Sequence, residues 1–257
     1  MKQLLGILSV IVMFGMAGYS IFFSTSPAIS ENQTESTQSS TQNSEAKKTA
    51  VQKEFPDLKA SDWNMVLVGP SNKIASEVAE DQLTTLSDNS HQLDSRVADA
   101  YEQFSNAATE AGYPLVVVSA FRSVATQEQV FNANVQTLEA QGYSAEDANT
   151  ETKKTITEPG FSEHHTGLAI DVVDQSWYNN YSTTVLDSAY GEQPGAQWIA
   201  ENAPKYGFII RYPEGEEAVT GITYEPWHLR YVGVNEAEYI SERNMTFEAF
   251  LNQLNGN

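Results

Sequence analysis

Cysteine is absent from the 257-residue sequence, and basic residues are scarce. Without thiols the chain can form neither a disulfide nor a thiolate metal site. Its 14 lysines and arginines are outnumbered by 34 aspartates and glutamates, which gives a formal charge of −20. Because phosphate binding requires clustered lysine and arginine, this balance argues against a nucleic-acid partner. We interpret the negative charge as a solvated surface that keeps the protein in solution.

Charge is also absent from residues 4–23, an apolar run preceded by Lys2. About twenty such residues suffice to span a bilayer as a helix, and a basic residue on the short side predicts a cytoplasmic amino terminus. We therefore predict that residues 1–23 form a membrane anchor or signal peptide. The length favours an uncleaved anchor, with the body on the extracytoplasmic face of the cell membrane. Cleavage near residues 24–28 would instead give a secreted protein.

Residues 24–54 contain mostly Ser, Thr, Gln, Asn and Glu and almost nothing apolar. A segment of this composition cannot bury enough apolar surface to order itself, so we predict a disordered linker. Residues 55–257 are numerous enough for one sizeable domain.

The domain combines two hydrophobic periods. Helical spacing of apolar residues predicts helices over 96–111, 125–141, 196–206 and 247–254. Short apolar and β-branched runs predict strands over 63–68, 115–118, 167–173, 208–212 and 223–232. This mixture favours an α+β fold, with a small, largely antiparallel sheet flanked by helices.

Three of the four histidines fall in two short segments, residues 162–171 and 225–228. The first offers a histidine and a carboxylate seven positions apart, and the second offers a histidine with a glutamate three positions before it. Two imidazoles and one carboxylate form a three-ligand set for catalytic zinc, which leaves a fourth position for water. The remaining carboxylate, Glu225, is then the natural general base. We predict a Zn²⁺ site at the face of the sheet with Glu225 as a catalytic residue.

These segments resemble the VanY-like zinc D,D-carboxypeptidases and their L,D-carboxypeptidase relatives, which trim peptidoglycan stem peptides. Residues 162–171 match the family motif Ser-x-His-x-x-Gly-x-Ala-x-Asp in register, and residues 225–228 match its Glu-x-x-His. Residues 119–127 are similar to the family's Ser-Gly-Tyr-Arg-Ser segment followed by a glutamine, with Ala120 and Phe121 in place of Gly and Tyr.

The resemblance implies a role for each matched residue. It assigns the metal to His164, Asp171 and His228, and leaves His165 as a flanking residue. It implies a substrate or transition-state role for Arg122, since a guanidinium can grip a carboxylate or an oxyanion. Further substrate contacts implied by the related L,D-carboxypeptidases are Gln127, Ser162 and Tyr212.

The implied activity is that of a monomeric zinc carboxypeptidase that removes the terminal D-alanine from peptidoglycan stem peptides. An L,D-carboxypeptidase acting on tetrapeptide stems remains an alternative, because both chemistries share the metal set. A peptidoglycan endopeptidase and a catalytically inactive wall-binding module are further alternatives. The complete set of ligands, base and arginine argues against the inactive module.

Overall fold

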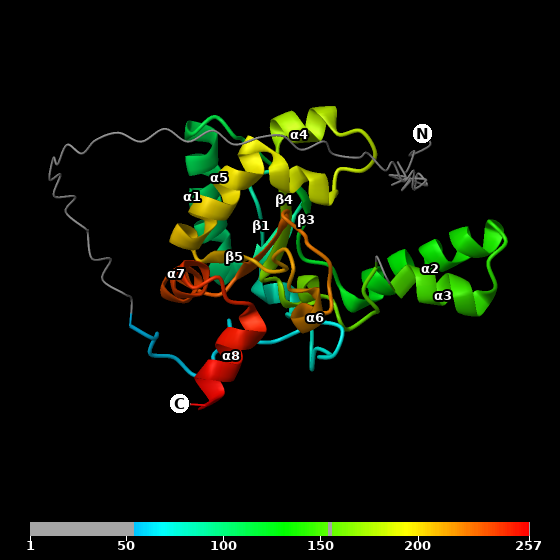
Figure 1. Cartoon of the computed structure of the whole chain (residues 1–257), viewed down its shortest axis with the longest axis horizontal. Helices are drawn as coiled ribbons and strands as arrows, with labels where there is room; N and C mark the ends of the chain where they lie inside the picture. Colours follow the sequence, from blue (N-terminus) through cyan, green and yellow to red (C-terminus); the bar gives the residue numbers. More distant parts are fainter. Residues whose placement is uncertain (1–53, 154–155, 257) are drawn as a thin grey trace, which may run out of the picture. The chain divides into compact units, whose positions relative to one another are not determined.

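The computed structural model of the protein describes residues 54–153 and 156–256. Its central element is a four-stranded sheet in the order β3-β4-β6-β5, in which neighbouring strands are antiparallel (Figure 1). These strands are β3 (Leu115–Ser119), β4 (Ala169–Asp174), β5 (Phe208–Ile210) and β6 (His228–Tyr231). A separate antiparallel pair consists of β1 (Leu83–Thr85) and β2 (Gln92–Asp94). The predicted α+β class with an antiparallel sheet is confirmed.

Helices surround this sheet. The α-helices are α1 (Ser95–Glu110), α2 (Val124–Ala140), α3 (Ala145–Lys153), α4 (Gln175–Asn180), α5 (Pro194–Asn202), α6 (Glu217–Thr220), α7 (Val234–Glu242) and α8 (Phe247–Gly256). Short 3-10 helices are η1 (Glu80–Gln82), η2 (Glu163–Thr166), η3 (Ser188–Glu192) and η4 (Ala203–Tyr206). Within the described part of the chain, each helix is too short or too polar to cross a membrane. The predicted anchor, and residues 24–53 of the predicted linker, lie outside the described residues.

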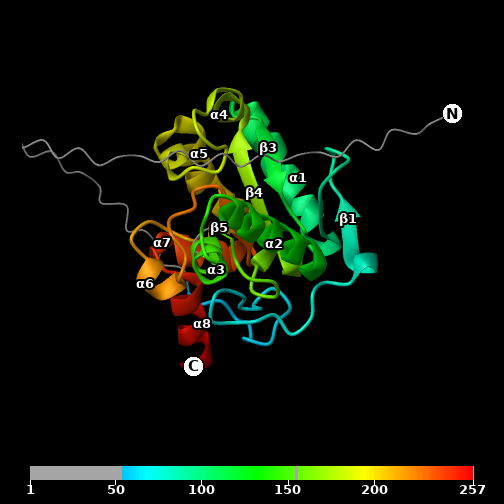
Figure 2. The same ribbon diagram turned by 90° about the vertical axis from the view of Figure 1, so that its right-hand side faces the viewer.

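One face of the sheet packs against α1 and α5, and α1 lies beside β3 and β4 (Figure 2). Buried side chains repeat along α1 at helical spacing, and they meet apolar side chains that alternate along β4 and β6. Members of this core include Val97, Tyr101, Phe104, Ile170, Val172, Ile199 and Leu229. The helix begins where the Asp94 carboxylate accepts a hydrogen bond from the backbone N–H of Arg96 at 2.9 Å, a side-chain cap.

The opposite face of the sheet carries a second core and a polar group. Apolar side chains from α7 and α8 pack there on Ile209 of β5. Because successive strand residues point to opposite faces, His228 and Arg230 lie on the face opposite Leu229. Every residue of β4 is buried, so both faces of this central strand are covered.

The segment 63–68, predicted as a strand, does not belong to either sheet. Two of its backbone carbonyls are paired with a side chain instead, since the Arg230 guanidinium donates to the carbonyl oxygens of Asn64 and Val66 at 3.1 and 2.8 Å. These two carbonyls therefore meet their hydrogen-bond requirement without a neighbouring strand. The strand predicted over 223–232 is likewise shorter, and only its second half pairs.

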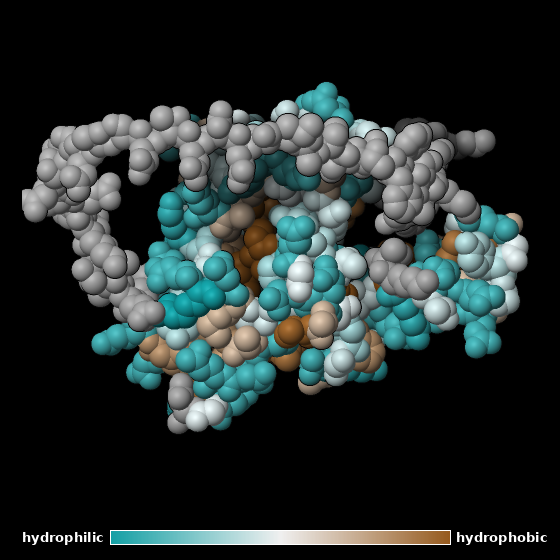
Figure 3. Space-filling model, in the orientation of Figure 1, coloured by the Kyte–Doolittle hydropathy of each residue, from teal (hydrophilic) through white to brown (hydrophobic). Residues whose placement is uncertain are grey.

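Helices α2 and α3 pack against each other and stand out at the right of Figure 1. Side chains on this pair are mainly hydrophilic in Figure 3. The sequence did not predict α3, because only Ala148 and Thr152 of its nine residues are buried and no apolar stripe marks it. The pair connects the end of β3 with the loop before η2, and both of these carry residues of the predicted site.

Candidate metal centre and active site

Asp171 and His228 stand directly opposite each other on β4 and β6. Directly opposed side chains project from the same face of a sheet, and Oδ1 of Asp171 lies 2.8 Å from Nδ1 of His228. The helix η2, immediately before β4, brings His164 to the same point, with Nε2 3.2 Å from Oδ2 of Asp171. One nitrogen or oxygen atom of each residue lies within 4.8 Å of the others, and all three residues are buried. This group can hold a metal ion.

The local chain path fixes these positions. The backbone N–H of His164 donates to the hydroxyl of Ser162, which caps η2. Gly167 then reverses the chain with φ 67°, a left-handed conformation that favours glycine. A Cβ on Gly167 would also lie 2.9 Å from the backbone nitrogen of Asp94. The motif glycine therefore permits a tight turn from η2 into β4.

The donor set fits zinc. Nδ1 of His164 lies 2.7 Å from the carbonyl oxygen of Ala120, which leaves Nε2 free to face Asp171. Burial alone would raise the pKa of Asp171, but His164 and His228 hold it well below its usual range. Burial would lower the pKa of His228, yet hydrogen bonds to Asp171 and Glu163 raise it to about 10. The surroundings of His228 thus favour a positive charge at this point, which a bound cation would supply in place of a proton. Two imidazoles with one carboxylate are a zinc ligand set.

Glu225 lies beside this group, in the loop before β6. Its backbone N–H donates to the carbonyl oxygen of Tyr212 at 3.1 Å, and its Oε2 is 3.8 Å from Nδ1 of His228. The loss of solvent raises the pKa of Glu225 to about 7, and the charges of Asp171 and Glu163 act in the same direction. A carboxylate with such a pKa can accept a proton near neutral pH and release it again.

Arg122 and Gln127 both carry a buried polar atom that lacks a hydrogen-bond partner among the described residues, namely Nε and Oε1. Burial lowers the pKa of Arg122, and the charges of Asp171 and Glu225 oppose that change. The backbone N–H of Arg122 donates to the carbonyl oxygen of His164 at 3.2 Å, so the end of β3 is joined to η2. Buried polar atoms without partners are unusual in folded proteins, which makes these two atoms candidates for a ligand contact.

The structure also locates the remaining predicted residues. The buried ring of Tyr212 lies 4.9 Å from the ring of His228, measured between centroids. Ser162 has a capping function at η2, as described above. His165 is buried outside the metal group, where Nδ1 lies 2.6 Å from the carbonyl oxygen of Arg122 and Nε2 accepts from the backbone N–H of Gly160. It therefore ties two loops together, in keeping with its interpretation as a flanking residue.

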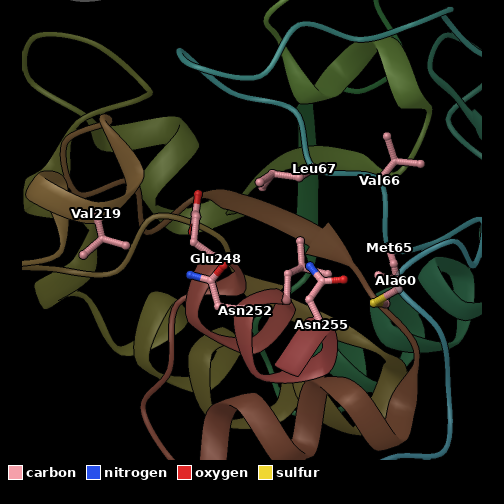
Figure 4. A pocket seen from close by; sticks show the side chains of 9 residues that line it. Ala60, Met65, Val66, Leu67, Val219, Glu248, Asn252 and Asn255 are labelled. Atoms are coloured by element: carbon pink, nitrogen blue, oxygen red, sulfur yellow. The ribbon is translucent and has the colours of Figure 1, made fainter. Parts of the chain in front are cut away.

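The structure contains a buried ion-pair network beside His228 that was not predicted from the sequence. Oε1 of Glu163 accepts from Arg211 and Arg230, each at 2.8 Å, and Oε2 lies 3.3 Å from Nε2 of His228. Arg211 also forms two hydrogen bonds with Glu248, which borders a surface groove between α8 and residues 65–67 (Figure 4). The sequence signal for this network was Arg230, a charged residue between Leu229 and Tyr231 in a predicted strand.

Comparison with known proteins identifies the family. The model of the family described as "VanY: D-alanyl-D-alanine carboxypeptidase" matches residues 90–234. The chain belongs to the VanY family. It is 30% identical over 211 residues to a D-alanyl-D-alanine carboxypeptidase of Enterococcus faecalis. This match covers 82% of this chain and 73% of that protein. It is 38% identical over 157 residues to YodJ of Bacillus subtilis, covering 61% of this chain but only about half (52%) of YodJ.

Solved structures of VanY proteins share the fold. A variant of the vancomycin resistance D,D-pentapeptidase VanY from a VanB-type cassette, in complex with Zn(II), is 31% identical with a TM-score of 0.62, and the match covers 74% of this chain and 99% of that one. VanYB in complex with D-alanine-D-alanine matches with a TM-score of 0.63 at 31% identity, over 74% and 98% of the two chains. The LdcB LD-carboxypeptidase is also 31% identical, with a TM-score of 0.62 over 73% and 85% of the chains.

Proposed function

We propose that this chain is a zinc-dependent D-alanyl-D-alanine carboxypeptidase that removes the terminal D-alanine from peptidoglycan stem peptides. The observation that carries the proposal is the buried group of His164, Asp171 and His228, with Glu225 and Arg122 close to it, in a chain of the VanY family. The names of its relatives and the complex of VanYB with D-alanine-D-alanine support the substrate class.

His164, Asp171 and His228 would hold the zinc ion, which when bound supplies a Lewis acid and an activated water. Glu225 would take a proton on its carboxylate and pass it to the leaving amine of D-alanine, in keeping with its pKa of about 7. The Arg122 guanidinium, with Nε unpaired, would hold the terminal carboxylate or the oxyanion. We further propose that Gln127, Ser162 and Tyr212 line the substrate site.

Mass spectrometry of purified muropeptides, incubated with the protein, tests this function. A D,D-carboxypeptidase shortens pentapeptide stems by one D-alanine and leaves tetrapeptide stems intact. Conversion of tetrapeptides to tripeptides would establish L,D-cleavage, the activity named for the LdcB neighbour. Cleavage inside cross-linked dimers would establish the endopeptidase, and binding without hydrolysis in the presence of zinc would establish an inactive wall-binding module. The carboxypeptidase proposal fails in each of these last two cases.

A stem peptide amidated at its carboxyl end tests the proposed grip of Arg122. An enzyme that recognises a free terminal carboxylate should cleave the amide poorly, because the amide carries no charge for the guanidinium. Equal cleavage of the acid and the amide would contradict an exo-acting enzyme.

We also propose that residues 1–23 anchor the protein at the extracytoplasmic face of the cell membrane, with residues 24–54 as a tether for the domain at 55–257. The support is the uncharged apolar run and the polar composition that follows it. A flexible chain spans on average about 5–6 Å × √n, so roughly thirty residues reach about 30 Å. Cell fractionation should find the intact protein in the membrane, and a shortened form in the medium would establish the secreted alternative. A monomer remains our prediction.

A further inference from the structure

His164 and His228 face the metal group through different nitrogens. His164 turns Nε2 toward Asp171, and its Nδ1 lies against the carbonyl oxygen of Ala120. His228 turns Nδ1 toward Asp171, and its Nε2 lies against a carboxylate oxygen of Glu163. A metal-binding nitrogen must be free of its proton, so the proton of a neutral imidazole has to sit on the other ring nitrogen. For His228 that nitrogen is Nε2, and the acceptor beside it is Glu163.

Glu163 is held firmly on the side away from His228. Its Oε1 accepts from Nε of Arg211 and Nη1 of Arg230, both at 2.8 Å, which leaves Oε2 for the imidazole. Side chains of the three residues are at most 1% exposed. Arg211 is fixed in turn by two hydrogen bonds to Glu248. Two arginines therefore fix one oxygen of the Glu163 carboxylate and limit its rotation.

Arg230 links this arrangement to the start of the domain. Its Nη2 donates to the carbonyl oxygens of Asn64 and Val66, so the guanidinium is fixed from two directions. Ion pairing of Glu163 with two arginines does not by itself require Oε2 to face an imidazole nitrogen. Oε1 of Glu163 contacts the two arginines, and Oε2 contacts His228.

We infer that Glu163 is a positioning residue of the metal centre, which accepts a hydrogen bond from Nε2–H of His228 and so keeps the unprotonated Nδ1 directed at the metal. The inference rests on the proposed function, since it assumes that His228 is a ligand. Such outer partners of metal-bound histidines set the tautomer and the ring orientation, and their loss typically weakens metal binding about 10–100-fold.

The test compares Glu163→Gln with Asp174→Asn in the full chain. Both changes convert a buried carboxylate to an amide, but Asp174 caps α4 at the far end of β4 and does not contact a residue of the metal group. The amide of Glu163→Gln can turn its NH₂ toward His228 and displace the proton to Nδ1. Zinc affinity of the metal-free proteins, measured by competition with a chromogenic chelator, should fall about 10–100-fold in Glu163→Gln. It should stay at the wild-type value in Asp174→Asn.

Unfolding of the metal-free proteins, followed by circular dichroism, separates positioning from a general loss of fold. If Glu163→Gln does not fold, Glu163→Asp keeps the charge but withdraws the carboxylate by one methylene, and its zinc affinity should also fall. Wild-type zinc affinity in a folded Glu163 variant would overturn this inference alone. Absence of zinc binding by the unmodified protein would overturn the proposed function as well.

Discussion

Replacing Glu225 with glutamine removes a proton acceptor and almost nothing else. The side chain keeps its size, and its 25% exposed surface leaves room for an amide to be hydrated. The backbone N–H of Glu225 still donates to Tyr212, so the loop should keep its path. The three predicted zinc ligands are untouched, and His228 loses only a 3.8 Å contact with a carboxylate oxygen. Zinc content should therefore remain at the wild-type level.

The expected loss of turnover follows from the role of a general base. Positioned proton transfer contributes roughly 10²–10⁴-fold to rate, which corresponds to about 2.7–5.4 kcal/mol of transition-state stabilisation. Because the amide cannot take up a proton, we expect the whole of this contribution to disappear. The loss should fall on kcat, since the proton moves in the chemical step.

Release of D-alanine from a pentapeptide stem, measured at saturating substrate, provides the assay. Glu217→Gln is the matched control, because it makes the same change at an exposed position on α6. Turnover of Glu225→Gln within threefold of wild type, with zinc bound, would refute the assignment of the base. Loss of zinc from this variant would show instead that Glu225 supports the metal group.

Four further outcomes are expected. His164→Ala should lose zinc by elemental analysis while His165→Ala retains it, and the reverse result would reassign the ligand. Activity should fall with decreasing pH as Glu225 becomes protonated, with the midpoint of kcat/KM below about 7, because a bound cation lowers the pKa from its value of about 7; a profile flat down to pH 4 would contradict this. Arg122→Lys should reduce kcat by about 10²-fold with unchanged zinc content, since lysine lacks the planar fork. Gly167→Ala should lower the free energy of unfolding by about 1–3 kcal/mol in denaturant titrations, because φ is 67° and the Cβ would crowd Asp94.

The metal group was predictable because each of its residues lies in a short segment that carries a recognisable motif, although Asp171 and His228 are 57 residues apart. His164 and Asp171 are seven residues apart in one segment, and the resemblance of that segment to a known motif distinguishes His164 from His165. The strand register completes the group, because pairing of β4 with β6 places Asp171 opposite His228. The prediction required only that both segments lie in one sheet.

The ion-pair network was not predictable by the same means. Glu163 meets Arg211 and Arg230 across 48 and 67 residues of sequence, and no spacing rule connects such positions. A contact of Arg230 also explains why the strand predicted at 63–68 is wrong. A short apolar run resembles a strand in sequence whether its carbonyls meet another backbone or a guanidinium. Sequence periodicity reports burial, and it does not identify the partner of each hydrogen bond.

Two glutamates flank His228, and their surroundings separate their roles. Burial alone would raise the pKa of Glu163, but the charges of Arg211 and Arg230 hold it well below its usual range. A carboxylate so stabilised in its charged form is a poor proton acceptor and a good fixed partner for an imidazole N–H. Among the residues that the structure describes, no arginine is bonded to the Glu225 carboxylate, and burial raises its pKa to about 7, so it can exchange a proton near neutral pH. The division that we propose between a base and a positioning residue therefore follows from the placement of two arginines.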